Sequence, residues 1–574
     1  MSTPSRVNIA DYLVDIALRR PHALAVVFPD GADAAGRVRY THLTYAQLNA
    51  ESDRLAAGLI AEGIGPGVRT VLMTPPSLDF FALVFALFKV GAVMVCVDPG
   101  LGIKHLGRCL AEAEPNAFVG VAKAHWARRL FGWAKKTIRK NIVVGTGPAT
   151  WTCGTPLAEI ARRGDQRIKD EGLSVPESPF PAPSQASHLK PHASSDAAAI
   201  LFTSGSTGPP KGVVYTHANF DAQLRALRDA FDIRPGEIDL ATFPLFALYA
   251  PALGMTAIVP DMDFTRPGSV DPTKIAQAID DFGVTNLFGS PALLDRVSRW
   301  GLDAGRKFPT LRRVISAGAP VPVRVIQRTT AMLAPGVQVF TPYGATESLP
   351  VASIGSEEIL GETRRASEQG RGVCVGRPVG DATVRVIHIR DDAIERWSDD
   401  LLVASGAVGE IVVSGPAVTA AYHARGEATR LAKIADASQP TGFWHRMGDV
   451  GYFDDRGRLW FCGRKSQRVR LAGGDLFTDP CEGVFNVHPD VRRSALVGVG
   501  QNGQTRPVVC VELVESPRES PDAIRAELLR LAGTFEHTRA IRDVLFHPAF
   551  PVDIRHNAKI GREALARWAA ERLR

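Results

Sequence analysis

The segment that most constrains this chain is a run of small and hydroxyl-bearing residues directly after a short apolar strand. Residues 197–202 are apolar, and the run Thr203-Ser-Gly-Ser-Thr-Gly-Pro-Pro-Lys-Gly-Val213 follows them. Small residues let backbone N–H groups approach a phosphate, hydroxyl groups add further donors, and Lys211 adds positive charge. No Gly-Lys-Ser/Thr follows at the Walker A spacing. The sequence therefore predicts another kind of phosphate loop, formed by Thr203, Ser204, Gly205, Ser206, Thr207 and Gly208.

Alternating helix and strand patterns surround this loop. Between residues 8 and 150, helices are expected at 11–19 and 45–61, the second capped by Thr44, and strands at 70–73 and 93–97. Such alternation predicts parallel sheets with crossover helices. Residues 174–197 are rich in Pro, Ser and Ala and indicate a linker.

The second half of the chain becomes strand-rich and then changes character. Strands are expected at 383–389 and 409–414, and a different pattern begins after Gly463, with strands at 495–499 and 508–513 and a helix at 520–532. We therefore expect an α/β protein with a large N-terminal domain over 1–463 and a small α+β C-terminal domain over 464–574.

Composition excludes several classes of protein. The chain has 574 residues, 45% hydrophobic and 22% charged, with a net charge of +7. These values indicate a soluble globular protein, with no transmembrane segment and no targeting signal, so we expect a cytoplasmic location. No nucleic-acid-binding motif occurs, and the seven scattered cysteines show no metal-binding spacing.

One basic segment interrupts the N-terminal pattern. Residues 124–140 read AHWARRLFGWAKKTIRK, with aromatic residues among six Lys and Arg. An amphipathic basic helix can make peripheral contact with a membrane or receive an anionic amphiphile. The alternative is a surface helix whose aromatic side packs inward beneath the basic side chains.

The phosphate loop resembles that of the adenylate-forming superfamily, which includes acyl-CoA synthetases, nonribosomal adenylation domains and luciferases. Companion motifs follow in the order of that superfamily: Tyr343-Gly-Ala-Thr-Glu347, Gly448-Asp449 with Leu459 to Arg464, and Asn557-Ala-Lys559-Ile-Gly-Arg562. The resemblance spans nearly the whole chain. It implies βα-layered subdomains, a distorted barrel, and a mobile C-terminal cap.

The resemblance also implies a role for each motif in forming an acyl-adenylate from ATP and a carboxylate. Glu347 would hold Mg²⁺, and Thr346 would contact phosphate. Tyr343 would stack on adenine, Gly318-Ala319-Pro320 would line the other face, and Gly344 would belong to the nucleotide site. Asp449 would accept the ribose hydroxyl groups, Arg464 would reach ribose or phosphate, and Lys559 would bridge the carboxylate and the developing charge.

Features associated with thiol capture of the adenylate depart from the common pattern. Ser466 stands at the hinge position, Asp475 stands where some relatives have Arg, and Ala247 stands where His is common. The segments 97–104, 109–115 and 123–128 resemble the bacterial olefin-pathway β-lactone synthetases. That resemblance implies a long-chain 2-alkyl-3-hydroxy acid, whose own hydroxyl group attacks the activated carbonyl. It also implies a pathway reductase and a β-lactone decarboxylase as partners. A long-chain acyl-CoA or acyl-carrier ligase is the alternative.

The alkyl branches of such a substrate require apolar volume. Candidate lining residues, each of which could equally be core, are Phe246, Leu248, Tyr249, Leu253, Met255, Phe288 and Leu293. The base for the 3-hydroxyl group stays open between His217, which is more typical of a structural histidine, and the phosphate of the leaving AMP.

Overall fold

The computed structural model describes residues 8–171, 193–202, 209–243, 248–500, 505–552 and 560–573. The predicted phosphate loop, Lys559, Phe246 and Ala247 lie outside these described residues.

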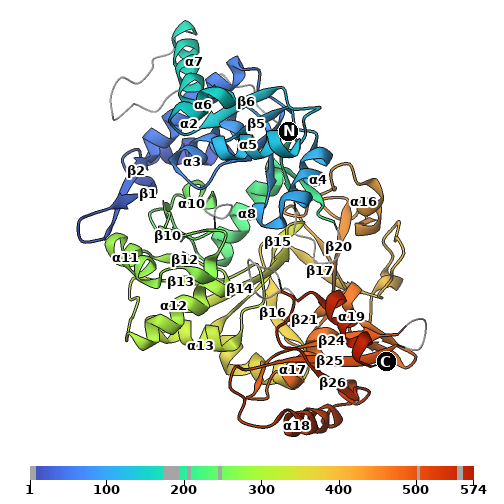
Figure 1. Cartoon of the computed structure of the whole chain (residues 1–574). Helices are drawn as coiled ribbons and strands as arrows, with labels where there is room; N and C mark the ends of the chain where they lie inside the picture. Colours follow the sequence, from blue (N-terminus) through green and yellow to red (C-terminus); the bar gives the residue numbers. More distant parts are fainter. Residues whose placement is uncertain are drawn as a thin grey trace.

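A seven-stranded sheet in the order β7-β6-β5-β3-β4-β8-β9 is formed by strands between residues 69 and 216 (Figure 1). Its pairs are parallel except β8 with β9. Its strands are β3 (Arg69–Met73), β4 (Val93–Val97), β5 (Ala117–Val121), β6 (Lys140–Val144), β7 (Thr155–Pro156), β8 (Ala197–Phe202) and β9 (Gly212–Thr216). The connecting helices are α2 (Tyr45–Ala61), α3 (Leu78–Lys89), α4 (Ile103–Ala113), α5 (Ala122–Phe131), α6 (Pro148–Cys153) and α7 (Leu157–Asp170). The expected parallel sheet with crossover helices is confirmed, and Thr44 caps α2 by accepting from the Gln47 N–H.

A fourteen-stranded sheet forms the middle of the molecule. Its order is β17-β18-β20-β21-β16-β15-β14-β13-β12-β10-β11-β1-β2, with β19 beside β20. The strands are β1 (Leu24–Ala32), β2 (Val38–Thr44), β10 (Ile238–Ala241), β11 (Thr256–Ile258), β12 (Asn286–Phe288), β13 (Arg313–Ile315), β14 (Gln338–Ala345), β15 (Ser348–Gly355), β16 (Val373–Pro378), β17 (Thr383–Ile387), β18 (Gly409–Ser414), β19 (Lys433–Ala435), β20 (Phe443–Phe453) and β21 (Leu459–Arg464). From β14 to β17 the pairing is antiparallel, so the strands in the place of the expected distorted barrel continue this sheet.

Helices cover the middle sheet. They are α1 (Ile9–Arg19), α8 (His217–Ala230), α10 (Tyr249–Ala252), α11 (Pro272–Phe282), α12 (Pro291–Asp303), α13 (Val323–Ala331), α14 (Ser356–Glu358), α15 (Arg364–Glu368) and α16 (Gly426–Ala432). One buried cluster joins α1, α2, α3 and α8, and a second joins α11, α12 and α13 to β10, β12, β13 and β14.

The chain after β21 forms two small sheets of its own. They are β22 (Val469–Leu471) with β23 (Gly474–Leu476), and β24 (Val491–Val499), β25 (Arg506–Leu513) and β26 (Asp543–Phe546). Helices α17 (Thr478–Phe485), α18 (Pro521–Thr534) and α19 (Arg562–Arg572) complete this α+β part, drawn in red in Figure 1. The fold is thus mixed α/β with a large N-terminal sheet region and a small C-terminal domain, as expected.

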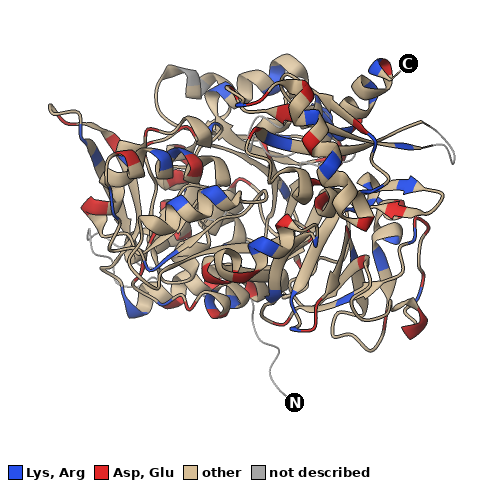
Figure 2. Ribbon diagram, turned by 90° about the horizontal axis from the view of Figure 1, so that it is seen from below, with Lys and Arg blue, Asp and Glu red and all other residues tan. Residues whose placement is uncertain are grey.

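The distribution of charged residues and the state of the cysteines agree with the composition. Basic and acidic positions are interspersed along the ribbon in Figure 2, and all seven cysteines are free. Among the described residues, no helix is both long and apolar enough to cross a membrane.

The prediction of one helix over 124–140 is wrong. Helix α5 ends at Phe131 because Gly132 takes a left-handed conformation with φ of 66°, and β6 begins at Lys140. The alternative of inward aromatic packing also fails for most of the segment: Trp133 is buried, whereas Trp126 and Phe131 are exposed.

Candidate active site

A cavity of about 3050 Å³ among the described residues lies where the three regions of the chain meet, and it is lined by residues of all three. It brings together every predicted site residue that the structure describes: Lys211, Gly318, Ala319, Pro320, Tyr343, Gly344, Thr346, Glu347, Asp449 and Arg464. Segments from the start of β9 to the end of β21 therefore converge on one place.

Asp449 and Arg464 face each other because β20 and β21 are antiparallel and pair these two residues in register. Arg464 Nη1 lies 2.8 Å from Asp449 Oδ1, and the Tyr343 hydroxyl group donates to Asp449 Oδ2 at 2.6 Å. Asp449 is only 2% exposed, and this burial raises its pKa, against the opposing effects of Arg464 and Tyr343. Burial and the Asp449 carboxylate raise the pKa of Tyr343 well above its usual range. The arrangement presents a buried, oriented acceptor to the cavity.

The turn between β14 and β15 carries Thr346 and Glu347. A Cβ atom at Gly344 would lie 2.6 Å from the Ser348 carbonyl oxygen, so this tight turn requires glycine. The Tyr215 hydroxyl group donates to the Thr346 carbonyl oxygen, and Gln223 Nε2 donates to the Tyr215 hydroxyl at 3.2 Å. These contacts fix the backbone beside the Glu347 carboxylate.

Tyr422 is a site residue that the sequence reasoning missed. Its hydroxyl group donates to Glu347 Oε1 at 2.7 Å, and Lys211 Nζ lies 4.7 Å from the centre of its ring. One tyrosine thus contacts both the acidic and the basic group of the predicted phosphate site. Its only sequence signal is an aromatic residue in the loop before α16, which is too common to single out.

Glu347 is the residue predicted to hold a magnesium ion, and its carboxylate lines the cavity. Mg²⁺ keeps most of its ligands as water and substrate phosphate oxygens and needs only one or two protein carboxylates. The described residues contain no group of three His, Cys, Asp or Glu suited to a metal. One carboxylate in this turn would therefore suffice for an ion that arrives with a nucleotide.

Gly318, Ala319 and Pro320 follow β13 at its carboxyl end and line the cavity as an exposed loop. Gly318 has φ of 94°, a conformation that favours glycine. The short side chains leave backbone and a flat surface toward the cavity, which suits contact with a planar ring.

The predicted apolar residues divide into three groups. Leu248, Tyr249 and Phe288 line the large cavity. Leu253 and Met255 line a smaller pocket beside Tyr249 and Phe288. Leu293 lines neither space: it is fully buried in the core between α11, α12 and α13, the alternative left open for each candidate. His217 is also fully buried, with its ring against Phe88, and it does not line the cavity.

The C-terminal motif is held by a buried ion pair. Arg562, three positions after Lys559, donates to both carboxylate oxygens of Glu482, with a 2.9 Å contact from Nη2 to Oε2. Arg562 Nε also donates to Gln467 Oε1 at 3.1 Å, next to the predicted hinge residue Ser466. One guanidinium group therefore links the segment after Lys559 to the hinge.

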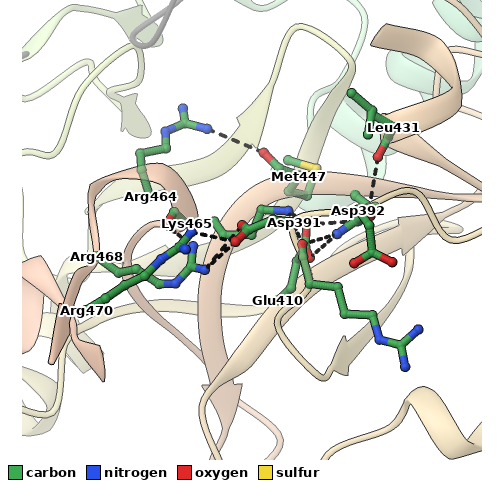
Figure 3. Close-up of polar contacts among 11 residues, drawn as sticks. Asp391, Asp392, Glu410, Leu431, Met447, Arg464, Lys465, Arg468 and Arg470 are labelled. Carbon is green, nitrogen blue, oxygen red and sulfur yellow. Dashed lines mark hydrogen bonds and ion pairs between the residues drawn. The ribbon is translucent and has the colours of Figure 1, made fainter. Parts of the chain in front are cut away.

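The hinge itself is fixed to the large sheet by a charged cluster, shown in Figure 3. Lys465 Nζ lies 2.8 Å from Glu410 Oε1, and Arg446 Nη2 lies 2.7 Å from Glu410 Oε2. Beyond the hinge, Arg468 pairs with Asp391 at 3.0 Å and with Asp475 at 2.8 Å. Asp475 thus holds the β22–β23 hairpin to Arg468.

Comparisons with known proteins agree with this geometry. Residues 14–423 match the family described as AMP-binding enzyme. A Xanthomonas campestris protein named olefin beta-lactone synthetase is 50% identical over 570 residues, covering 98% of each chain. A Stenotrophomonas maltophilia protein of the same name is 48% identical over 570 residues, covering 99% of this chain and 98% of that one. The solved amide bond synthetase McbA of Marinactinospora thermotolerans superposes with a TM-score of 0.75 at 22% identity, covering 98% of this chain and 99% of that one.

Proposed function

From the premise that this chain belongs to the AMP-binding enzyme family and is an AMP-forming ligase that uses ATP, we propose that it converts a long-chain 2-alkyl-3-hydroxy acid into a β-lactone, AMP and pyrophosphate. The observation that carries the proposal is similarity along nearly the full length to two olefin beta-lactone synthetases. The cavity supports it by joining nucleotide-binding groups to a large apolar space.

In the first half-reaction, a carboxylate oxygen attacks the α-phosphate of ATP and pyrophosphate leaves. Asp449 accepts the ribose hydroxyl groups, with Tyr343 and Arg464 setting the direction of its oxygens. Tyr343 and the Gly318-Ala319-Pro320 loop hold the adenine ring between them. Phosphoryl transfer depends on positioning and charge neutralisation more than on covalent chemistry, so a rigid cradle serves it.

Negative charge at the phosphates is balanced by Lys211, and Thr346 and loop 203–208 add hydrogen-bond donors. Glu347 would hold a magnesium ion, which would supply further positive charge at the phosphates. Tyr422 keeps one Glu347 oxygen in place and so orients the other. Lys559 would neutralise the substrate carboxylate as it approaches the phosphate.

In the second half-reaction, the 3-hydroxyl oxygen attacks the carbonyl carbon of the adenylate, and AMP leaves with the electron pair of the acyl–phosphate bond. Nucleophile and electrophile belong to one molecule, so binding in a folded conformation supplies most of the proximity. The hydroxyl proton passes to the phosphate of the leaving AMP. The burial of His217 away from the cavity supports this route over a histidine base.

The C-terminal part over 464–574 is proposed to act as a domain distinct from 1–463 and to turn about Ser466. The Lys465–Glu410 contact fixes the chain before the pivot, and the Arg468–Asp391 pair is the contact that rotation would break. Arg562 carries the movement of the hinge to the Lys559 segment through Gln467. The pathway reductase and the β-lactone decarboxylase stay proposed partners.

One incubation tests the proposal. The protein, ATP, Mg²⁺ and a 2-alkyl-3-hydroxy acid are combined without coenzyme A, and β-lactone and AMP are measured. Formation of both in equal amounts supports the proposal. AMP release that depends on coenzyme A and a simple fatty acid, without lactone, would show an acyl-CoA ligase instead.

A further inference from the structure

Helix α5 has an inverted distribution of polar and apolar side chains. Its inner face buries His125 and Arg128: His125 Nε2 lies 2.9 Å from the Ile142 carbonyl oxygen, and Arg128 donates to Asn141 Oδ1 at 2.8 Å. Its outer face exposes 55% of Trp126, 78% of Leu130 and 47% of Phe131. The helix therefore buries two polar side chains and presents its largest apolar groups to the outside.

This exposure is concentrated rather than scattered. Within the described parts of the chain, ten large apolar side chains are exposed, and three of them fall within six residues of α5. Exposed apolar groups that gather in this way mark an interaction surface, whereas single ones need no explanation. A fourth, Ile103, is 56% exposed at the start of α4, the helix that Trp133 packs against beside Gly107.

The chain segment that carries these groups has charge of one sign. From Pro115 to Ala158 the chain contains no Asp or Glu, but it has seven Lys and Arg residues. Lys123, Lys135, Lys136 and Arg139 among them are exposed. Aromatic and aliphatic groups with surrounding lysines are the combination that inserts at the headgroup boundary of an anionic bilayer.

The same helix reaches the active-site cavity from its other side. Lys123, Ala124 and Ala127 of α5, with Trp133, line the cavity that also contains Glu347 and Asp449. The exposed apolar groups thus stand within a helix turn or two of the inner space.

We propose that the α5 platform, defined as Trp126, Leu130 and Phe131 with Lys135 and Lys136, docks the enzyme on an anionic lipid bilayer. The bound surface then lies beside the cavity wall formed by α5. Delivery of a long-chain acid from that bilayer rests on the proposed function, whereas the docking itself does not.

Vesicle co-sedimentation of the full-length protein tests the docking. Vesicles of phosphatidylglycerol with phosphatidylcholine should bind the protein, and pure phosphatidylcholine should bind it at least about tenfold more weakly. Leu130→Glu and the pair Lys135→Glu with Lys136→Glu should each reduce binding by about tenfold or more. Leu18→Glu, at a leucine of α1 that is 56% exposed, is the matched control and should bind like the unaltered protein.

Failure of the unaltered protein to bind anionic vesicles would overturn the proposal, and so would equal loss in Leu18→Glu and Leu130→Glu. Capture of an acidic soluble protein by the platform, with no vesicle binding, would also overturn it. Pyrophosphate release with a short soluble hydroxy acid is measured in parallel. Unchanged release in Leu130→Glu separates a docking defect from a failure of folding or of the proposed function.

Discussion

The Tyr422 hydroxyl group donates a hydrogen bond to Glu347 Oε1 at 2.7 Å, while Lys211 Nζ lies 4.7 Å from the ring of the same tyrosine. Tyr422 therefore connects the turn after β14 to the residue that precedes β9. Burial and the Glu347 carboxylate raise the pKa of Tyr422, so it stays a neutral donor across the physiological range. The carboxylate that would hold Mg²⁺ is thus oriented by a residue outside the recognised motifs.

Tyr422→Phe should weaken the response to Mg²⁺. A hydrogen bond to a charged group contributes about 1.5–3 kcal/mol, which corresponds to about ten- to a hundredfold in the magnesium concentration needed for half-maximal pyrophosphate release. Tyr452→Phe is the matched control, because the Tyr452 hydroxyl group donates to the Arg371 carbonyl oxygen outside the site. An unchanged magnesium requirement in Tyr422→Phe would show that Tyr422 does not orient Glu347 for magnesium.

Substitutions at the ribose site should have graded effects. Asp449→Asn removes the ionised acceptor and should raise the KM for ATP by about ten- to a hundredfold, since hydrogen bonds to charged groups are the strong ones. Tyr343→Phe keeps the ring but loses the 2.6 Å bond to Asp449, so a smaller increase is expected. Initial rates at varied ATP concentrations give the KM of each variant and so check the order of the two effects. A larger effect of Tyr343→Phe than of Asp449→Asn would contradict it.

Glu482→Gln should impair adenylation although Glu482 lies in α17, outside the recognised motifs. The substitution removes the buried ionic partner of Arg562 and so loosens the segment that follows Lys559. We expect pyrophosphate release to fall by about tenfold or more, toward the value for Lys559→Ala. Glu527→Gln, at a half-exposed glutamate paired with His488, is the matched control and should stay active. Thermal unfolding of both variants separates positioning from loss of the fold.

Asp239 should make stability depend on pH. Burial raises the pKa of Asp239 from 3.8 to about 7, with Glu237 adding to the rise and Asn286 and Arg313 opposing it. The folded state therefore holds a proton that the unfolded state releases, and this contribution is full below pH 3.8 and is lost as the pH rises to about 7. Relative to Asp239→Asn, the unaltered protein should lose a few kcal/mol of unfolding free energy across this interval. Urea unfolding of both proteins at pH 3.8 and at about pH 7 measures this loss. If the unfolding free energies of the two proteins change in parallel with pH, the assignment is contradicted.

The helices and strands predicted best from the sequence are those that neighbouring residues in the chain determine. The strands at 93–97 and 409–414 and helix 45–61 match because their apolar spacing and caps are continuous in the chain. Motif order also predicted which described groups would share a cavity. Tyr422 and Glu482 were missed because their partners lie far away in the chain and neither residue type is unusual in its place.

Two open alternatives have a common physical origin. Leu293 could line the cavity or lie in the core, and the aromatic residues of 124–140 could pack inward or meet a membrane or an amphiphile, because apolar character alone does not say which of two surfaces a side chain meets. The buried contacts of His125 and Arg128 determine which face of α5 turns inward. Sequence reasoning places residues of these two types on the outside.

The central claim is that the 3-hydroxyl group attacks an acyl-adenylate, and oxygen labelling tests it directly. The substrate carries ¹⁸O in both carboxylate oxygens and is converted with ATP and Mg²⁺ in the absence of coenzyme A. The account predicts that one labelled oxygen leaves in the phosphate of AMP and the other stays in the lactone carbonyl, with the ring oxygen unlabelled. Unlabelled AMP and a lactone carrying both labelled oxygens would contradict it, because the carboxylate would then have displaced an activated 3-hydroxyl group.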